Sequence, residues 1–331
     1  MELSSKIYVA GHQGLVGSAL CRALDKAGYS NVIVQTPQQL DLRVQSDVEA
    51  FFWTEKPEYV FLAAARVGGI KANITYPAHF IYDNILIAAH VINSAYLHDT
   101  KKLLFFGSSC LYPRDCAQPI KESYLLTGPL EETNRPYALA KIAGMELCNA
   151  YNKQYGTQFI TCMPTNLYGS HDNFDIESAH VIPALIAKIV KAHEVSAPHV
   201  ALWGTGRAIR EFLYVDDCVD AALFLMNSYE DYKTPLNIGT GEGCTIAQLA
   251  LMIAHIIGYT GAFIFDGQLE GTHCKVLDVT RIHNLGWRAH ISLEEGLKKT
   301  IAWYYEQKNS GIEAYRITPC MKTEFTSLHD L

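Results

Sequence analysis

Short apolar runs alternate with amphipathic helical patterns through the first half of the chain. The apolar runs predict strands at 6–10, 31–35, 59–62, 103–107 and 159–163. Between them, apolar positions recur at helical spacing and predict helices at 15–28, 46–53, 76–97 and 134–155. Strand–helix alternation with fully apolar strands is typical of a parallel sheet that is covered by helices on both faces.

The second half is less regular and contains shorter elements. After residue 167 come loops rich in His, Asn, Asp, Gly and Pro. The later pattern predicts helices at 182–193, 215–226, 246–257 and 293–306, and strands at 200–203 and 211–214. We therefore expect an α/β protein of the Rossmann type, with a doubly wound parallel sheet and a smaller C-terminal α/β substrate lobe. The expected division is a nucleotide-binding domain at 1–170 with returning segments near 205–240, a substrate lobe mainly at 171–310, and a tail at 311–331.

Composition narrows the possible partners and the compartment. With 49% hydrophobic and 18% charged residues, the 331-residue chain can bury a large core. Its net charge of -7 disfavours nucleic acid as a partner, and no apolar run is long enough to predict a membrane span. The nine cysteines are dispersed, with no spacing that predicts a metal site. Together with the lack of an export signal, they indicate reduced thiols and a cytoplasmic protein.

A glycine-rich loop directly follows the first predicted strand. It consists of Gly11, His12, Gln13, Gly14, Leu15, Val16 and Gly17. Glycines at three-residue spacing allow a tight turn and a close approach of the backbone to a pyrophosphate, which the next helix binds through its N-terminal N–H groups. Because the loop lies between a strand and a helix, it predicts a dinucleotide site.

The choice between NADP(H) and NAD(H) is not decided by the residues after the second predicted strand. An acidic residue there would hold a ribose hydroxyl, and arginines would hold a 2′-phosphate. The chain instead continues with Gln35, Thr36, Pro37, Gln38 and Gln39. Both nicotinamide cofactors therefore remain possible from this segment.

A serine, a tyrosine and a lysine suggest carbonyl chemistry. Ser108 follows an apolar strand, and Tyr137 and Lys141 lie one turn apart on a predicted helix. A nearby ammonium is expected to lower the pKa of the phenol, which could then exchange a proton with a carbonyl oxygen. The glycine loop, the serine and the YxxxK spacing occur in the order typical of extended short-chain dehydrogenases/reductases, which the chain resembles.

Cys110 and His180 suggest a second activity. Sugar-nucleotide dehydratases of this group carry an Asp-Glu pair where this chain has Ser109 and Cys110, so dehydration is disfavoured. A thiolate can remove a proton next to a ketone, and a histidine can donate one to the opposite face. Taken singly, each residue is more easily explained as a packed thiol or a helix-start histidine.

Several longer runs resemble the GDP-L-fucose synthase family over nearly the whole chain. The runs are AAARVGGI at 63–70, GSSCLYP at 107–113, YALAKIAG at 137–144, PTNLYG at 164–169, HDNF at 171–174 and REFL at 210–213. Members are bifunctional: they epimerise GDP-4-keto-6-deoxy-D-mannose at the two carbons beside the ketone and reduce the ketone with NADPH. The resemblance implies a GDP-sugar substrate and NADP(H) as cofactor, with no metal.

The resemblance also implies a role for individual residues. Tyr137 would donate the proton in reduction with Lys141 as its partner, Ser108 would hold the keto oxygen, and Cys110 and His180 would be the epimerisation base and acid. Cofactor contacts are implied for the glycine loop and for Asp41, Leu42, Ala63, Ala64, Lys141, Pro164, Asn166, Leu167 and His180. Substrate contacts are implied for Lys188, Trp203, Arg210, Glu270 and Lys275. Extended members usually pair through the helices predicted near 76–97 and 134–155, so a homodimer is expected.

Departures from the family pattern leave alternatives open. Gln13 and Pro37 stand where bacterial members show arginines, so NADH is not excluded. Lys188 replaces an arginine and keeps its charge but loses the planar fork. Glu270 and Cys274 replace an aspartate and an arginine. These changes leave a GDP-6-deoxy-4-keto-heptose as an alternative substrate. A cofactor-binding regulator without activity is disfavoured by the intact serine, tyrosine and lysine.

Overall fold

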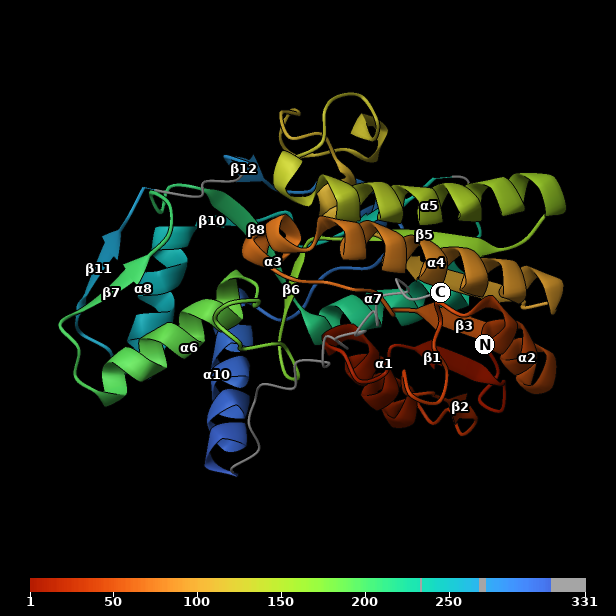
Figure 1. Cartoon of the computed structure of the whole chain (residues 1–331), viewed down its shortest axis with the longest axis horizontal. Coiled ribbons are helices and arrows are strands. Elements are labelled where there is room, and N and C mark those ends of the chain that lie inside the picture. Colours follow the sequence, from red (N-terminus) through yellow and green to blue (C-terminus); the bar gives the residue numbers. More distant parts are fainter. Residues whose placement is uncertain (233, 268–271, 311–331) are drawn as a thin grey trace, which may run out of the picture.

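A six-stranded parallel sheet forms the centre of the protein (Figure 1). In spatial order it consists of β2 (Val32–Ile33), β1 (Ile7–Ala10), β3 (Tyr59–Leu62), β4 (Lys102–Phe106), β5 (Phe159–Pro164) and β9 (Leu236–Ile238). The computed structural model describes residues 1–232, 234–267 and 272–310, so Glu270 and the predicted tail at 311–331 lie outside the described residues. The sheet confirms the predicted α/β class of the Rossmann type.

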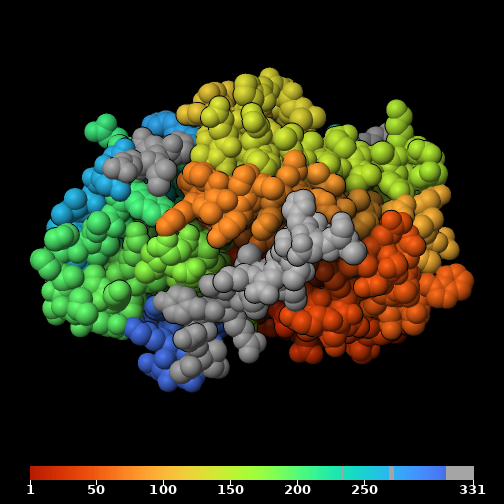
Figure 2. All heavy atoms as spheres, in the orientation of Figure 1, coloured from red at the N-terminus to blue at the C-terminus, as the bar shows by residue number. Residues whose placement is uncertain are grey.

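Helices cover both faces of this sheet. On one face, α1 (Leu15–Lys26) packs against α7 (Val215–Ser228), and on the other α2 (Gln45–Glu55) packs against α4 (Pro77–Leu97). The second face also carries α5 (Arg135–Tyr155), which lies alongside α4 over its length, as Figures 1 and 2 show. The strands and the inner faces of these helices form one continuous hydrophobic core, which Leu277 and Trp287 complete.

A second α/β region has its own core. Its main sheet is built on β8 (Ile209–Tyr214), which pairs in parallel with β6 (Asn166–Tyr168) and β12 (Cys274–Lys275) and antiparallel with β10 (Gly243–Thr245). Beside it, β7 (His199–Leu202) and β11 (Ala262–Phe265) form a parallel pair. The helices of this region are α6 (Val181–Glu194), α8 (Ile246–Ile257) and α10 (Leu293–Asn309). Their apolar faces enclose the second core, around Leu185, Ile253 and Leu297.

Short elements connect the two regions near the carboxyl ends of the central strands. They are α3 (Ile70–Thr75), η1 (Ser109–Leu111), η2 (Glu122–Tyr124), η3 (Glu132–Asn134) and α9 (Thr280–Asn284). The segment that contains η2 projects beside the start of α5 in Figure 1. Ile120 joins it to the second region, because its N–H donates to Val276 (2.7 Å) and its carbonyl accepts from Asp278 N–H (2.8 Å).

The long predicted elements are confirmed, whereas several short ones were missed or misjudged. The strand predicted at 31–35 shrinks to two residues, since this edge strand has a partner on one side only. The helix predicted at 15–28 ends at Lys26, and Gly28 (φ +86°) then reverses the chain. The sequence analysis did not predict β6, β9, β10, β11, β12, α3 or α9. These elements span two to six residues, too few to show a period.

Candidate functional site

The glycine loop forms a tight turn that joins β1 to α1 and packs against the residues that follow β3. Gly11 adopts φ +89°, and a Cβ there would lie 2.7 Å from the Cα of Ala64. A Cβ on Gly17 would overlap the Gly11 carbonyl oxygen. The turn therefore requires glycine at both positions, and it brings Ala63 and Ala64 next to the loop, as expected for residues that share one ligand.

The loop has features that fit the pyrophosphate of a dinucleotide. α1 begins at Leu15 after Gly14, and among the described residues no side chain caps this end, so its first N–H groups point outward from the turn. His12 adds a buried Nδ1 without a hydrogen-bond partner in the described structure. Burial lowers the pKa of His12. The Gln35 carbonyl, which accepts a hydrogen bond from the ring, raises this pKa by a smaller amount. This unsatisfied nitrogen beside the turn is consistent with a bound polar ligand.

Asp41, predicted to contact the cofactor, is held by an arginine that the sequence analysis did not consider. Arg43 donates to both carboxylate oxygens of Asp41 (2.9 and 2.7 Å) and to Asp83 (3.4 Å). These hydrogen bonds hold the pKa of Asp41 below its usual value. Arg66 also donates to Asp83 (2.6 Å). Arg43, the arginine that follows β2 in the sequence, is thus already paired with carboxylates. Leu42 lies between Asp41 and Arg43.

Ser108, Tyr137 and Lys141 meet at the carboxyl end of β4. Ser108 directly precedes η1 and accepts a hydrogen bond from Cys110 N–H (3.1 Å), and its hydroxyl lies within hydrogen-bonding reach of the Tyr137 oxygen. Lys141 is 4% exposed and donates to the carbonyl of Phe106, the last residue of β4 (2.8 Å). One face of α5 thus directs Tyr137 to the serine and Lys141 to the last residue of β4.

The expected pKa of the tyrosine is corrected by the structure. Burial raises the pKa of Tyr137, the charge of Cys110 adds to the increase, and the hydrogen bond from Ser108 opposes it. Burial also lowers the pKa of Lys141 to about 8. The ammonium is directed to a backbone carbonyl rather than to the phenol, so it does not offset the cost of a buried phenolate. Tyr137 is therefore held as the neutral phenol, the form that donates a proton.

Cys110 lies next to a lysine that comes from the second region. The Nζ of Lys275 is 4.0 Å from the Sγ of Cys110, although the two residues are 165 positions apart in the sequence. Lys275 is 9% exposed, and Arg210 lies opposite it on the adjacent strand β8. Lys275 was predicted to contact the substrate, and the structure places it beside the predicted base.

His180 directly precedes α6. The residue is exposed, yet partial loss of hydration around the imidazole lowers its pKa. The preceding loop is fixed by Ser178, whose carbonyl accepts from Gly69 N–H (2.9 Å) and whose hydroxyl donates to Asp175 (2.8 Å). Among the described residues, no hydrogen bond joins His180 to Ser108, Cys110 or Tyr137.

Lys188 and Trp203 form a pair, and Arg210 lies in β8 beside Lys275 of β12. The Lys188 ammonium lies 5.0 Å from the centre of the Trp203 ring, a cation–π contact. Burial lowers the pKa of Lys188, against the charges of Asp266 and Glu177. Arg210 donates to the Ile209 carbonyl (2.8 Å). These cations and the aromatic face can bind a diphosphate and a base.

Glu211 is a structural centre that the sequence analysis missed. Its buried carboxylate accepts backbone N–H groups of Thr240 (2.6 Å), Gly241 (2.9 Å) and Leu277 (2.7 Å). The carbonyl of Glu211 accepts from Asn166 (2.8 Å), which was predicted to contact the cofactor together with Pro164 and Leu167. The sequence did contain a signal for this role, because Glu211 is an acidic residue directly before the apolar residues 212–214. Glu211 therefore holds β6, β8 and the segment after β12 in a fixed relation.

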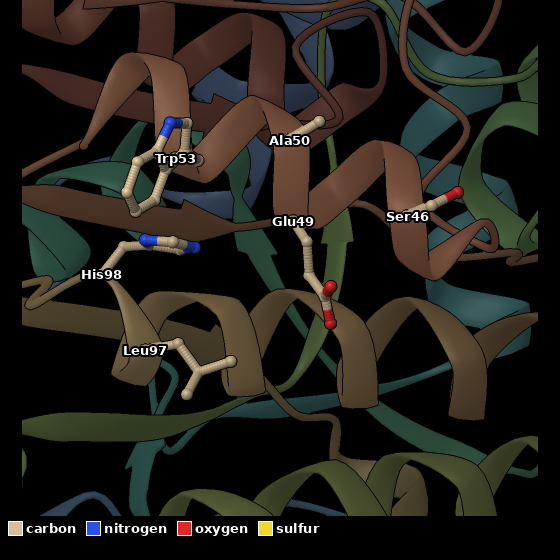
Figure 3. A pocket seen from close by; sticks show the side chains of 6 residues that line it. All are labelled: Ser46, Glu49, Ala50, Trp53, Leu97 and His98. Carbon is tan, nitrogen blue, oxygen red and sulfur yellow. The ribbon is translucent and has the colours of Figure 1, made fainter.

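Other candidate sites are absent or lie elsewhere. Within 1–232, 234–267 and 272–310, no group of three His, Cys, Asp or Glu could hold a metal. No helix among these residues is long and apolar enough to cross a membrane. A surface hollow between α2 and the end of α4 is lined by Glu49, Trp53 and His98 (Figure 3). It lies at the amino ends of the strands, the edge opposite to the glycine loop and Ser108.

Together, these features define the class of protein. These features are typical of a nicotinamide-dependent enzyme that acts on carbonyl compounds: a glycine turn on a doubly wound sheet, with Ser108, Tyr137 and Lys141 at the strand ends. Residues 7–239 match the NAD dependent epimerase/dehydratase family, and the chain belongs to it.

Within this class the chain belongs to the GDP-L-fucose synthases. It is 47% identical to GDP-L-fucose synthase of Escherichia coli, over 92% of this chain and 98% of the relative. It is 50% identical to GDP-L-fucose synthase 1 of Arabidopsis thaliana, over 92% of this chain and 94% of the relative.

Solved structures include two related enzymes with NADP. A GDP-L-fucose synthetase of Naegleria fowleri bound to NADP has a TM-score of 0.87 at 28% identity, covering 95% of this chain and 96% of that one. A GDP-mannoheptose C4 reductase of Campylobacter jejuni with NADP bound has a TM-score of 0.85 at 40% identity, covering 92% and 99%.

Proposed function

We propose that the chain is an NADP(H)-dependent epimerase/reductase that converts GDP-4-keto-6-deoxy-D-mannose to GDP-L-fucose. It inverts carbons 3 and 5 and reduces the 4-ketone. The observation that carries this proposal is the meeting of Ser108, Cys110 and Tyr137 at the end of β4. A proton-transfer thiol and a carbonyl-binding pair beside one another are what the two half-reactions need. Membership in the GDP-L-fucose synthases supports the same substrate.

In the epimerase half, Cys110 acts as a thiolate base. It takes a proton from a carbon next to the ketone, and the electron pair of the broken C–H bond forms an enolate. The hydroxyls of Ser108 and Tyr137 donate to the enolate oxygen. His180, at the start of α6, returns a proton to the opposite face of the same carbon, which inverts the centre.

In the reductase half, Tyr137 is the proton donor. Bound NADPH supplies the hydride for the carbonyl carbon. Because burial raises the pKa of Tyr137, the phenol is protonated at neutral pH and can protonate the carbonyl oxygen. Lys141, as the partner of Tyr137, has its pKa lowered to about 8 and remains mostly charged at pH 7, with its ammonium held by the Phe106 carbonyl at the end of β4.

The two regions divide the binding of cofactor and substrate in this proposal. Residues 1–170, with segments near 205–240, bind NADP(H) through Gly11–Gly17 and the ends of β1 and β3. Residues 171–310 bind the GDP-sugar, with Lys188, Trp203, Arg210 and Lys275 toward the nucleotide diphosphate and base. The cation–π pair of Lys188 and Trp203 supports this division. We further propose a homodimer that pairs through α4 and α5, and a location in the cytoplasm.

A second candidate is a GDP-6-deoxy-4-keto-heptose as substrate. The likeness to a GDP-mannoheptose C4 reductase supports it, as does Lys188, which offers a point charge in place of a bidentate guanidinium. Competition between the keto-hexose and the keto-heptose nucleotides, measured as the ratio of kcat/KM values, separates the two.

Incubation with substrate and NADPH in deuterated water tests the main proposal. We expect deuterium at both carbons beside the former ketone, read by NMR of the product. Cys110→Ser should lose this incorporation, whereas Cys116→Ser, a matched change six residues away, should retain it. A product that carries deuterium at neither of these carbons would contradict the epimerase half. Failure to consume NADPH with either keto-sugar would instead indicate a regulator.

A further inference from the structure

Lys275 is a buried cation for which the described residues provide no carboxylate partner. It is 9% exposed, and in the described part of the chain its recorded side-chain partner is the sulfur of Cys110 at 4.0 Å. No ion pair to a carboxylate is found for it in the same residues. A buried ammonium without a counter-charge is costly, and a neighbouring thiol that ionises would remove that cost.

The backbone around Lys275 holds its position independently of any ligand. Two residues later, Leu277 N–H donates to the Glu211 carboxylate (2.7 Å). The Val276 carbonyl accepts a hydrogen bond from Ile120 N–H (2.7 Å). The backbone of Lys275 lies opposite that of Arg210 in the pairing of β12 with β8. On the other side, the Ser108 hydroxyl fixes the backbone of Cys110 (3.1 Å). The 4.0 Å approach thus results from two anchored segments rather than from two free side chains.

We propose that Lys275 is a positioning residue that holds Cys110 in its thiolate form. An opposite charge within about 4–6 Å changes an ionisation equilibrium by about tenfold or more when solvent is largely excluded. The contribution to catalysis rests on the proposed function, because the thiolate is the base that takes the proton beside the ketone. The effect on the thiol itself does not depend on that function.

The other titratable groups near Cys110 do not replace Lys275. From α5, Tyr137 is neutral, and Lys141 turns its ammonium to the Phe106 carbonyl. From β8, the carboxylate of Glu211 is taken up by backbone N–H groups. Burial raises the pKa of Cys116, and the charge of Lys275 opposes this increase. Among these groups, Lys275 is the cation whose ammonium contacts the Cys110 sulfur.

Alkylation of the intact protein by iodoacetamide tests the proposal without turnover. Only the thiolate reacts, so the rate at Cys110, followed by peptide mass spectrometry, reports its ionisation. We expect Lys275→Met to slow this rate by about tenfold at pH 7, with the two rates converging at pH 10. Lys275→Arg should restore most of the rate. The half-buried Cys21, on α1, is the internal reference and should react equally in every variant.

Lys121→Met, a change at an exposed lysine near the same segment, is the matched control and should leave the Cys110 rate unchanged. Equal rates at pH 7 in the wild type and Lys275→Met would overturn the proposal. If Lys275→Met does not fold, Lys275→Gln takes its place with the same expectation. Slower alkylation of Cys110 in Lys275→Met would support the effect of the lysine even if the wild-type product contained no deuterium. That combination of results would contradict only the proposed function.

Discussion

The two ends of the site are built in different ways. The nucleotide end, Gly11–Gly17 with Ala63 and Ala64, comes from two strand ends that are neighbours in the sheet. The carbonyl end, Ser108, Cys110, Tyr137, Lys141 and Lys275, takes residues from β4, α5 and β12. The first is formed mainly by backbone geometry, and the second by side chains that come from elements far apart in the sequence.

This difference separates how the two ends respond to change. A backbone turn tolerates few substitutions, but its ligand contacts are general to dinucleotides. The side-chain cluster depends on the relative placement of two regions, which Glu211 and Ile120 hold together through buried hydrogen bonds. Substitutions at the carbonyl end should therefore alter individual chemical steps, whereas substitutions beside the nucleotide end should alter the preference between cofactors.

The largest effect is expected for Tyr137→Phe. Removing the proton donor should reduce ketone reduction by about 10³-fold, because general acid catalysis contributes about 10²–10⁴. The Kd for NADPH should stay unchanged, since the nucleotide end is separate. Deuterium incorporation should fall much less, because Cys110 and Ser108 remain. Single-turnover oxidation of NADPH and fluorescence titration measure the two quantities.

Tyr151→Phe is a matched control on the same helix, where the hydroxyl donates to Asn93 (2.7 Å) far from Ser108. It should keep the wild-type reduction rate. A loss below tenfold in Tyr137→Phe would show that another group protonates the oxygen, and a weaker NADPH affinity would show that the two ends are not independent.

The two ends also differ in how well the sequence predicted them. The glycine loop and the Tyr137–Lys141 spacing are local patterns, and the structure places each as the pattern predicts. The contact of Lys275 with Cys110 spans 165 residues and depends on β12, a strand of two residues with no period to detect. The predicted lowering of the Tyr137 pKa was wrong, because burial, which no local pattern reports, raises this pKa and the Lys141 ammonium is directed to the Phe106 carbonyl. The pairing of Arg43 with Asp41 and Asp83 was missed for the same reason: one partner lies 40 residues away.

A smaller effect is expected at Asp172, in the loop that leads to His180. Burial raises its pKa to about 7, and its Oδ2 is a buried atom without a partner in the described structure. The folded-state pKa lies above the unfolded value near 4, so the folded protein loses stability as pH rises from about 4 to 7. Asparagine cannot ionise. Asp172→Asn should therefore match the wild type near pH 4.5 and exceed its unfolding free energy by about 2–4 kcal/mol at pH 8.

Urea unfolding of both proteins at each pH measures this difference. Asp175→Asn, in the same loop, is the control: its carboxylate already accepts from Ser178 (2.8 Å), so the change should bring no gain at pH 8. A stability difference between Asp172→Asn and the wild type that stays constant from pH 4.5 to 8 would contradict a buried carboxyl with a raised pKa.

The smallest effect is expected at the nucleotide end, for Gln35→Arg. Arg43, which follows β2 in the sequence, is bound to Asp41 and Asp83, so its guanidinium is already engaged by carboxylates. An added guanidinium can bind a 2′-phosphate bidentately. The ratio of kcat/KM for NADPH over NADH should rise by about tenfold, equivalent to about 1.4 kcal/mol. Steady-state kinetics with each cofactor measures the ratio.

Gln38→Arg adds the same charge three residues further along an exposed turn and should change the ratio by less than about twofold. Deuterium incorporation should be equal in both variants, because the carbonyl end is untouched. An equal rise in both variants would mean that general charge, not placement at the strand end, controls the preference. A change in deuterium incorporation would mean that the two ends are coupled through the sheet, against the separation that their construction implies.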